Sequence, residues 1–416
     1  MDGHEMFLGN ISITHLLFAD DLVLFSQTPI GLQRFLNCLE KYCARFHLTI
    51  NLSKTCIVVF RRGGKPAKSE KWFIKNNPIS VVSQFKYLGI VFSPTGSWYH
   101  AQKDLASRAR KAMFLIKKFV AKTRFRNPLI LFKIFDSCVL PILNYGCEIW
   151  GFHEGKDVEK VYNDFCKFVA GLPTSTCNIA ARGEFGRKRL IYYRFCRIIK
   201  YWIKLLNENC NPILKIAYNE QLRLDSAGHN VWASDVRVLL CSLGFSELWH
   251  SQSVPNQNIF FKEFKERLAC LELNMFELEK NKFHRLFLYS QLKTLSLSCH
   301  WSSDIPFYLQ NTFSKFICSA HKLAIETGRR QHTPRHMRIC MLCDRNEIED
   351  EFHFVLICPW YTDLRNRYIP DEFKTQPSWN KLISMLINPN YLKPVMFFLH
   401  SAFQKREKSI EAILYH

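Results

Sequence analysis

The sequence has no run of eighteen consecutive apolar residues, and its N-terminus has no basic segment followed by an apolar one. We therefore expect neither a transmembrane helix nor a secretory signal. It also lacks low-complexity stretches and repeats of fixed period, which argues against intrinsic disorder. Acidic residues are scarce, with 36 Asp and Glu against 57 Lys and Arg, so the net charge is +21 at pH 7. Such an excess indicates a polyanionic partner, either a nucleic acid or an acidic membrane surface.

The residues that build packed cores are abundant. Of the 416 residues, 48% are hydrophobic and 35 are Phe, and this length is enough for two to four domains. The sixteen cysteines mostly stand singly in apolar patterns, as Cys38, Cys138, Cys166 and Cys196 do. A long chain without a secretory signal is better explained as reduced than as disulfide-bonded. We therefore expect an intracellular protein, in the cytoplasm or the nucleus, that is not secreted.

Hydrophobic periodicity predicts a mixed N-terminal part and a helical remainder, and hence an α+β fold. Short strands are predicted within 11–26, 48–60, 73–74, 81–82 and 85–92, with one amphipathic helix at 30–46. The stretch 61–71 is basic and contains Gly and Pro, so we expect a loop there. Further helices are predicted at 101–121, 128–145, 157–171, 187–207, 230–243, 260–273, 281–296 and 380–412.

Two adjacent aspartates, Asp20 and Asp21, stand between the apolar runs 15–18 and 22–25. At the tip of a hairpin, their side chains would leave the core and form a doubly negative, oxygen-rich point. Such a point suits a hard cation such as Mg²⁺. A plain acidic turn is the alternative, because so short a motif often arises by chance.

The motifs that follow these aspartates give the pattern its specificity. After Phe18-Ala19-Asp20-Asp21 come a helical stretch, then Leu48-x-x-Asn51-x-x-Lys54-Thr55, then Phe85-Lys86-Tyr87-Leu88-Gly89. In order and spacing, these motifs resemble the C-terminal part of a reverse transcriptase palm. The resemblance is closest to LINE-type (non-LTR) retrotransposon enzymes. The segment 140–150 resembles one that often follows the thumb in such elements.

The resemblance implies two-metal nucleotidyl transfer in the full-length parent enzyme. Asp20 would be a ligand of the Mg²⁺ ions, Asp21 its less central companion, and Lys54 a proton donor near the leaving pyrophosphate. For Lys54, the alternative is a solvated lysine that caps a turn. The family also needs a third carboxylate on an upstream strand, yet the only acids before Asp20 are Asp2 and Glu5. We therefore expect a truncated palm that is inactive by itself.

The resemblance also implies contacts with nucleic acid. The segment 85–89 resembles the primer grip, so Lys86, Tyr87 and Gly89 would meet the primer; an ordinary core strand is the alternative. Lys and Arg form sequence-independent, salt-sensitive contacts with phosphate, and they cluster where the thumb is expected. The expected contacts in this cluster are Arg108, Lys111, Lys117 and Lys118. A solvated basic face is the alternative, and further basic clusters lie at 187–204 and 329–338.

A second strong pattern lies near the C-terminus. Cys340, Cys343, His353 and Cys358 have the spacing C-x₂-C-x₉-H-x₄-C. Three thiolates and one imidazole suit Zn²⁺ and leave no open coordination position, so the site would be structural. LINE-type elements often carry a similar cluster after the polymerase. A chance alignment in a cysteine-rich chain is the alternative.

These patterns predict a truncated palm at 1–98, a helical thumb at 99–172, a mostly helical connection at 173–330 and a zinc-bearing module with C-terminal helices at 331–416. Two functions stay open. The first is a truncated RNA-directed DNA polymerase that binds an RNA template and a DNA primer. It would use no small molecule besides nucleoside triphosphates and no membrane. The second is a non-catalytic, nucleic-acid-binding retrotransposon remnant with a structural zinc site, which the missing carboxylate favours.

Overall fold

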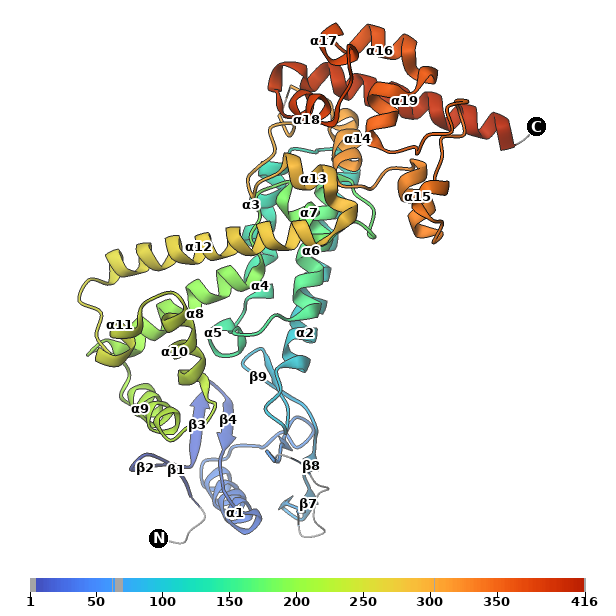
Figure 1. Cartoon of the computed structure of the whole chain (residues 1–416). Helices are drawn as coiled ribbons and strands as arrows, with labels where there is room; N and C mark the ends of the chain where they lie inside the picture. The colour runs from blue at the N-terminus through green and yellow to red at the C-terminus, as the bar shows by residue number, and fades with distance from the viewer. Residues whose placement is uncertain (1–4, 62, 64–69, 303, 415–416) are drawn as a thin grey trace. The chain divides into compact units, whose positions relative to one another are not determined.

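The structure is a computed structural model that describes residues 5–61, 63, 70–302 and 304–414 (Figure 1). These residues are mostly helical with a few short strands, which agrees with the expected α+β class. The chain divides into two compact units. Unit 1 contains Met1–Arg108, Leu143–Asp157 and Tyr193–Arg267, and unit 2 contains Ala109–Ile142, Val158–Tyr192 and Leu268–His416. The four domains expected from the sequence stay a prediction.

Unit 1 begins with two antiparallel hairpins. β1 (Met6–Leu8) pairs with β2 (Ile11–Ile13), and β3 (His15–Phe18) pairs with β4 (Asp21–Leu24). The hairpin predicted within 11–26 is therefore β3–β4, whereas β2 turns back to β1. Because Phe18 pairs with Asp21, the turn consists of Ala19 and Asp20 alone.

The helix predicted at 30–46 is α1 (Pro29–Arg45). Its N-terminus is capped by Thr28, whose Oγ1 accepts a hydrogen bond from the N–H of Gly31 at 3.1 Å. Pro29 fits the first helical turn because no N–H partner is needed there. The helix buries one face against a small core, which consists of Leu36, Ile57, Trp72, Ile74 and Ile79.

The other strands of unit 1 are short. They are β5 (Cys56–Ile57) parallel to β8 (Ser80–Val81), β6 (Phe73–Ile74) antiparallel to β7 (Asn77–Pro78), and β9 (Phe85–Tyr87) antiparallel to β10 (Ile90–Phe92). Within 48–60, the sequence predicts a strand or strand pair broken at 51–53; β5 is the strand that forms, and the break is a turn that Asn51 closes. Its carbonyl accepts hydrogen bonds from the N–H groups of Lys54 and Thr55 at 3.1 and 3.0 Å. Most of the loop predicted at 61–71 lies outside the described residues.

Helices complete unit 1. They are the start of α2 (Tyr99–Thr123), α5 (Cys147–Trp150), most of α8 (Leu190–Leu206), α9 (Pro212–Ser226), α10 (Trp232–Ser242), α11 (Ser246–Ser251) and the start of α12 (Gln257–Lys282). Trp202 of α8 is fully buried, and its indole N–H donates to the Tyr218 hydroxyl at 2.8 Å. The periodicity predicted neither α9 nor α11, and it predicted only the middle of α12.

Unit 2 is helical. It contains α3 (Pro128–Cys138), most of α4 (Leu140–Leu143), most of α6 (Lys156–Ala170), α7 (Asn178–Gly183), α13 (Phe287–Leu292), α14 (Phe307–Ile317), α15 (Ala324–Arg330), α16 (Thr362–Tyr368), α17 (Asp371–Lys374), α18 (Trp379–Ile387) and α19 (Pro389–Leu414). The long α19 packs against α14, α16 and α18 (Figure 1). None of the described helices is, by itself, long and apolar enough to cross a membrane.

Three helix predictions in unit 2 are wrong in extent. The one at 380–412 divides at Asn388 into α18 and α19. The helix expected at 128–145 breaks at Val139, because Pro141 has no N–H for the carbonyl of Ser137 and its ring crowds that carbonyl. The helix expected at 281–296 is shorter. α12 continues to Lys282, a 3₁₀ turn covers His284–Leu286, and α13 ends at Leu292.

Candidate functional site

The aspartate pair lies at an exposed turn. Asp20 is at the tip of the β3–β4 hairpin, Asp21 opens β4, and both side chains are exposed. Ala19 has a φ of +53°, a conformation that is sparse for alanine and that often accompanies functional turns. Among the described residues, no third potential ligand joins this pair. Two exposed carboxylates alone do not fit a pair of Mg²⁺ ions, which share carboxylate and phosphate oxygens.

The motif around Lys54 forms a compact turn. Besides the two N–H bonds described above, the carbonyl of Asn51 accepts a hydrogen bond from the Thr55 hydroxyl at 2.9 Å. The Ser53 hydroxyl donates to the side-chain carbonyl of Asn51 at 2.7 Å. Lys54 is exposed. The turn accounts for Asn51 and Thr55 structurally, while the role of Lys54 near pyrophosphate stays a prediction.

The β9–β10 hairpin has a tight two-residue turn. Leu88 and Gly89 have φ values of +46° and +81°, as the turns favoured in hairpins require. A Cβ on Gly89 would lie 3.0 Å from Cε1 of Tyr145, so glycine serves both the backbone angle and the close packing. Both turn carbonyls are engaged. The Tyr145 hydroxyl donates to Leu88 O at 2.9 Å, and Nη2 of Arg108 donates to Gly89 O at 2.8 Å.

Two of the expected phosphate-binding cations share one carboxylate. Nζ of Lys86 and Nε of Arg108 each lie 3.0 Å from Oδ2 of Asp104. The Lys86 and Arg108 side chains are 44% and 35% exposed, so solvent screens these ion pairs. Asp104 was not predicted from the sequence, although its spacing of four residues before Arg108 is typical of a helical ion pair.

The part of α2 in unit 2 has two faces. Ala109, Met113, Ile116 and Val120 are buried. The opposite face exposes Lys111 and Lys118, and between them Phe114 and Leu115, which are 63% and 66% exposed. Lys117 is half-buried, and its Nζ lies 5.1 Å from the ring centre of Phe168. Lys111 and Lys118 are therefore better placed for a polyanion than Lys117.

Three arginines of the basic cluster at 187–204 serve the fold. Arg187 makes two hydrogen bonds with Asp136, at 2.8 and 2.5 Å. Nη2 of Arg189 lies 2.6 Å from the buried carboxylate of Glu272. Arg194 is fully buried. Surface solvation and nucleic-acid binding are thus poor explanations for these three arginines.

The four C-terminal ligand candidates converge. The ligand atoms of Cys340, Cys343, His353 and Cys358 all lie within 4.8 Å of one another. A tetrahedral Zn²⁺ with bonds of about 2.3 Å to sulfur and about 2.0 Å to nitrogen places its ligand atoms about 3.8 Å (S–S) and about 3.5 Å (S–N) apart. The Sγ atoms of Cys340 and Cys358 are 3.9 Å apart, and Sγ of Cys343 is 3.5 Å from Nε2 of His353. The donor set and its spacing fit zinc.

Backbone hydrogen bonds hold these ligands in place. The N–H of Cys340 donates to Glu347 O at 2.9 Å, which closes the loop that carries Cys343. The segment His353–Ile357 is a π-helix, and the N–H of Cys358 donates to His353 O at 2.8 Å. Wide turns of this kind are frequent at functional sites. Here the π-helical turn brings His353 and Cys358 to the same side of the backbone.

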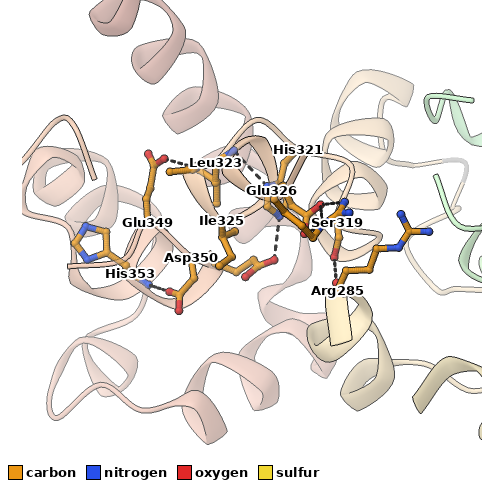
Figure 2. A network of polar contacts seen from close by, with 12 residues as sticks. Arg285, Ser319, His321, Leu323, Ile325, Glu326, Glu349, Asp350 and His353 are labelled. Carbon is orange, nitrogen blue, oxygen red and sulfur yellow. Dashed lines mark hydrogen bonds and ion pairs between the residues drawn. The ribbon is translucent and has the colours of Figure 1, made fainter. Parts of the chain in front are cut away.

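The ligands also have polar support. Nδ1 of His353 lies 2.9 Å from Oε2 of Glu347, an arrangement that orients metal-binding imidazoles. The backbone N–H of His353 donates to Oδ1 of Asp350 at 2.9 Å (Figure 2). A hydrogen bond from Cys358 lowers the pKa of Cys340 to about 4, so one thiolate forms readily. Burial lowers the pKa of His353, but hydrogen bonds to Cys340 and Glu347 outweigh it and raise the pKa. Glu347 was not predicted from the sequence, because the charged residues around it gave no distinguishing spacing.

An adjacent buried carboxylate ties this cluster to the helices of unit 2. Glu349 accepts hydrogen bonds from Nε and Nη2 of Arg406 in α19, at 2.7 and 2.6 Å. It also accepts one from the N–H of Ala324 at the start of α15, at 2.6 Å. Figure 2 shows Glu349 beside the segment that contains Leu323. The metal-ligand loop is therefore joined to both α15 and α19.

Comparison with known proteins finds similarity in the N-terminal part. Residues 3–92 match the family model described as reverse transcriptase (RNA-dependent DNA polymerase). A putative uncharacterized transposon-derived protein of Caenorhabditis elegans is 28% identical over 147 residues, which cover 34% of this chain and 50% of that protein. A probable RNA-directed DNA polymerase from transposon X-element of Drosophila melanogaster is 23% identical over 169 residues, which cover 37% of this chain and 18% of that protein.

The matched regions span at most half the length of either relative. The family match includes the aspartate turn, the Asn51 turn and the β9–β10 hairpin. These three features are the ones on which the sequence resemblance was based. Residues 3–92 are therefore similar to the reverse transcriptase family, and the two relatives are similar to this chain over about a third of its length.

Proposed function

We propose that this chain binds an RNA template and a DNA primer, and that Asp20 and Asp21 belong to the nucleotidyl-transfer site of a full-length non-LTR reverse transcriptase. The exposed face of α2 carries this proposal, because Lys111 and Lys118 project there with no acid described beside them. Lysines on a helix form salt-sensitive contacts with phosphate that do not depend on sequence. The net charge of +21 and the family match support the same partner.

The second candidate function is nucleic-acid binding without catalysis. It is favoured by the aspartate turn, where the described residues gather two carboxylates and no third. Nucleotidyl transfer by two Mg²⁺ ions needs a shared carboxylate in addition. We therefore propose that a polypeptide of these 416 residues binds primer–template but does not extend the primer. Lys54 would have no leaving pyrophosphate to protonate in such a complex.

We also infer that Cys340, Cys343, His353 and Cys358 hold one Zn²⁺ in a structural role. With four protein ligands, a tetrahedral zinc has no position left for water or substrate. The ion would supply folding free energy to the segment that contains its ligands. The converging ligand atoms and the support of His353 by Glu347 favour this assignment.

Fluorescence anisotropy with a labelled RNA–DNA primer–template, measured over a range of salt concentrations, tests the binding proposal. We expect log K to fall linearly with log salt. The double variant Lys111→Glu/Lys118→Glu should bind more weakly to all sequences, and its salt slope should be flatter by roughly one for each phosphate that the variant no longer binds.

Lys262→Glu/Lys265→Glu is the matched control, since it makes the same charge change on two lysines of α12. It should weaken binding less. Binding by the wild type that does not change with salt would overturn the proposal. So would an equal loss of affinity in both double variants.

A further inference from the structure

The segment 143–150 is anchored firmly in unit 1. The guanidinium of Arg194, in α8, is fully buried; its Nε donates to Oδ1 of Asn144 at 3.2 Å, and its Cζ lies 5.0 Å from the ring centre of Trp150. The indole N–H of Trp150 in turn donates to Tyr145 O at 2.9 Å. Arg194 therefore holds the Asn144 side chain, and Trp150 holds the carbonyl of Tyr145.

The end of this segment is held separately. The indole N–H of Trp232, in α10, donates to Glu148 O at 2.8 Å, and Nε of Arg197, in α8, donates to the Glu148 carboxylate at 2.8 Å. Two helices thus restrain one short segment. Such a segment can serve as a rigid support for whatever its remaining side chains contact.

Those remaining contacts lead to the β9–β10 hairpin. A Cβ on Gly146 would lie 3.0 Å from Cδ1 of Ile90, so the segment packs directly on β10. Tyr145 packs on Gly89 and donates its hydroxyl hydrogen to Leu88 O at 2.9 Å. On the other side, Arg108 holds Gly89 O at 2.8 Å. The turn is therefore bracketed by Tyr145 and Arg108.

We propose that Tyr145 is a positioning residue for nucleic acid: its hydroxyl fixes the Leu88–Gly89 turn so that the β9–β10 hairpin can contact the backbone of a primer strand beside its 3′ end. This inference rests on the proposed function. With both turn carbonyls taken up internally, neither oxygen is presented to a negatively charged phosphate. Lys86, two residues before Leu88, is the cation that the fixed hairpin offers instead.

The two hydrogen bonds to the turn come from donors with different surroundings. Arg108 also pairs with Asp104, so its hold on the turn changes whenever that ion pair changes. Tyr145 carries no charge, and the residues of α8 and α10 that hold its segment are not among the proposed contacts with nucleic acid. The tyrosine therefore sets the position of the turn independently of salt, which gives it an effect that can be separated from that of the lysines.

The variant Tyr145→Phe tests this inference, because it removes the hydroxyl and keeps the ring against Gly89. Affinity is measured at low salt for an RNA–DNA duplex with a recessed DNA 3′ end and for a blunt duplex of the same length. We expect the variant to bind the recessed duplex about three- to tenfold more weakly, the effect of removing one hydrogen bond. Its affinity for the blunt duplex and its salt slope should stay unchanged.

Hydrogen–deuterium exchange provides a second measurement in the same proteins. Peptides that cover 85–92 should exchange faster in Tyr145→Phe, and peptides from unit 2 should not. Tyr289→Phe is the matched control, since its hydroxyl also donates to a backbone carbonyl, that of Ala180 at 3.1 Å, but in unit 2. This control should leave both the ratio of the two affinities and the exchange of 85–92 as in the wild type.

The outcomes separate the two proposals. A wild type that binds neither duplex at low salt overturns the proposed function. If the wild type binds, the positioning role is overturned by an equal loss on the recessed and blunt duplexes, by no loss on either, or by equal wild-type affinity for the two. Unchanged exchange of 85–92 in Tyr145→Phe also overturns it.

Discussion

Nζ of Lys86 lies 3.0 Å from Oδ2 of Asp104, so a lysine expected to meet the primer is paired with the protein's own carboxylate. The same oxygen lies 3.0 Å from Nε of Arg108. A phosphate that approaches this hairpin must therefore compete with Asp104 for both cations. The competition is modest, because exposed ion pairs contribute only about 0.2–1 kcal/mol each.

Asp104→Asn should consequently raise the affinity for primer–template. We expect an increase of about two- to thirtyfold at low salt, since two partly exposed ion pairs are released. The salt slope should become steeper, because more cations are then available to phosphate. Anisotropy titrations measure both quantities. Asp371→Asn is the control, as it makes the same charge change in an exposed ion pair of unit 2; equal gains in both variants would contradict the prediction.

The wild-type polypeptide should not extend a primer on an RNA template in the presence of Mg²⁺. The reason is the aspartate turn, which brings Asp20 and Asp21 together without a third carboxylate among the described residues. A gel assay with labelled primer and all four nucleoside triphosphates measures extension. The variant Asp20→Ala should likewise show no primer extension. Template-dependent extension that disappears in Asp20→Ala would falsify the prediction.

The long amphipathic elements could be predicted from the sequence because their signals are local. The periodicity of α1, the breaks around α6 and the spacing of Cys340 and Cys343 are all properties of neighbouring residues. The short strands could not be predicted in the same way. β5 has two residues, and its partner β8 lies more than twenty positions along the chain, so pairing rather than local propensity determines it.

Two paired arginines show the same limit. Arg187 and Arg189 resemble a solvated basic cluster in the sequence, because their partners Asp136 and Glu272 lie far away along the chain. The tertiary fold alone brings those carboxylates close. The contact of Tyr145 with the β9–β10 turn could not be predicted from the sequence either, although the segment that contains this residue resembles a known motif.

One zinc ion per chain is expected at the C-terminal cluster. Cys343→Ser should lower the bound zinc from about one equivalent to about zero, because three ligands hold the ion much less tightly than four. Metal analysis of protein purified from zinc-replete medium measures this stoichiometry. Hydrogen exchange within 335–365 should rise in the variant, while peptides of unit 1 keep their protection.

Cys270→Ser is the control for this change, since Cys270 is an exposed cysteine of α12 outside the cluster. It should retain the zinc and the protection of 335–365. A wild-type protein with no zinc would refute the site. Retention of zinc by Cys343→Ser would show that another residue completes the set.

Arg406 and Lys405 are neighbours in α19 whose ion pairs should differ in strength. The Arg406–Glu349 pair is buried and has two hydrogen bonds, whereas Lys405 and Asp363 are 36% and 63% exposed. Arg406→Leu leaves a buried carboxylate without its cation and should lower the free energy of unfolding by about 3–5 kcal/mol. Lys405→Leu should cost about 0–1 kcal/mol. Chemical denaturation compares the two, and equal losses would contradict this explanation.

His300 should make the stability of unit 2 depend on pH. It is fully buried, and its Nε2 lies 2.8 Å from the Ser314 hydroxyl and 3.0 Å from Glu184. Among the described residues, its Nδ1 has no hydrogen-bond partner and is flanked by the rings of Trp301 and Phe313. Burial lowers the pKa of His300, because a proton on Nδ1 would have no acceptor.

The folded protein therefore binds a proton at His300 less readily than the unfolded chain, whose histidine pKa is about 6.5. The stability from neutral His300 is complete above that value and is lost as pH falls through the folded pKa. Glu184 adds a second loss at lower pH. Burial opposes its ionisation, but Lys293 and hydrogen bonds from His300 and Ser314 lower its pKa to about 2.

Thermal denaturation between about pH 7.5 and about pH 5 checks the histidine contribution. We expect the wild-type melting temperature to fall with pH, and we expect His300→Gln to fall less steeply because it cannot take up the proton. Loss of the proposed zinc would also destabilise the protein, so the comparison is between slopes of proteins with the same metal content. His15→Gln, which changes an exposed histidine of β3, should keep the wild-type slope. Parallel slopes for the wild type and His300→Gln would show that His300 does not titrate on unfolding in this range.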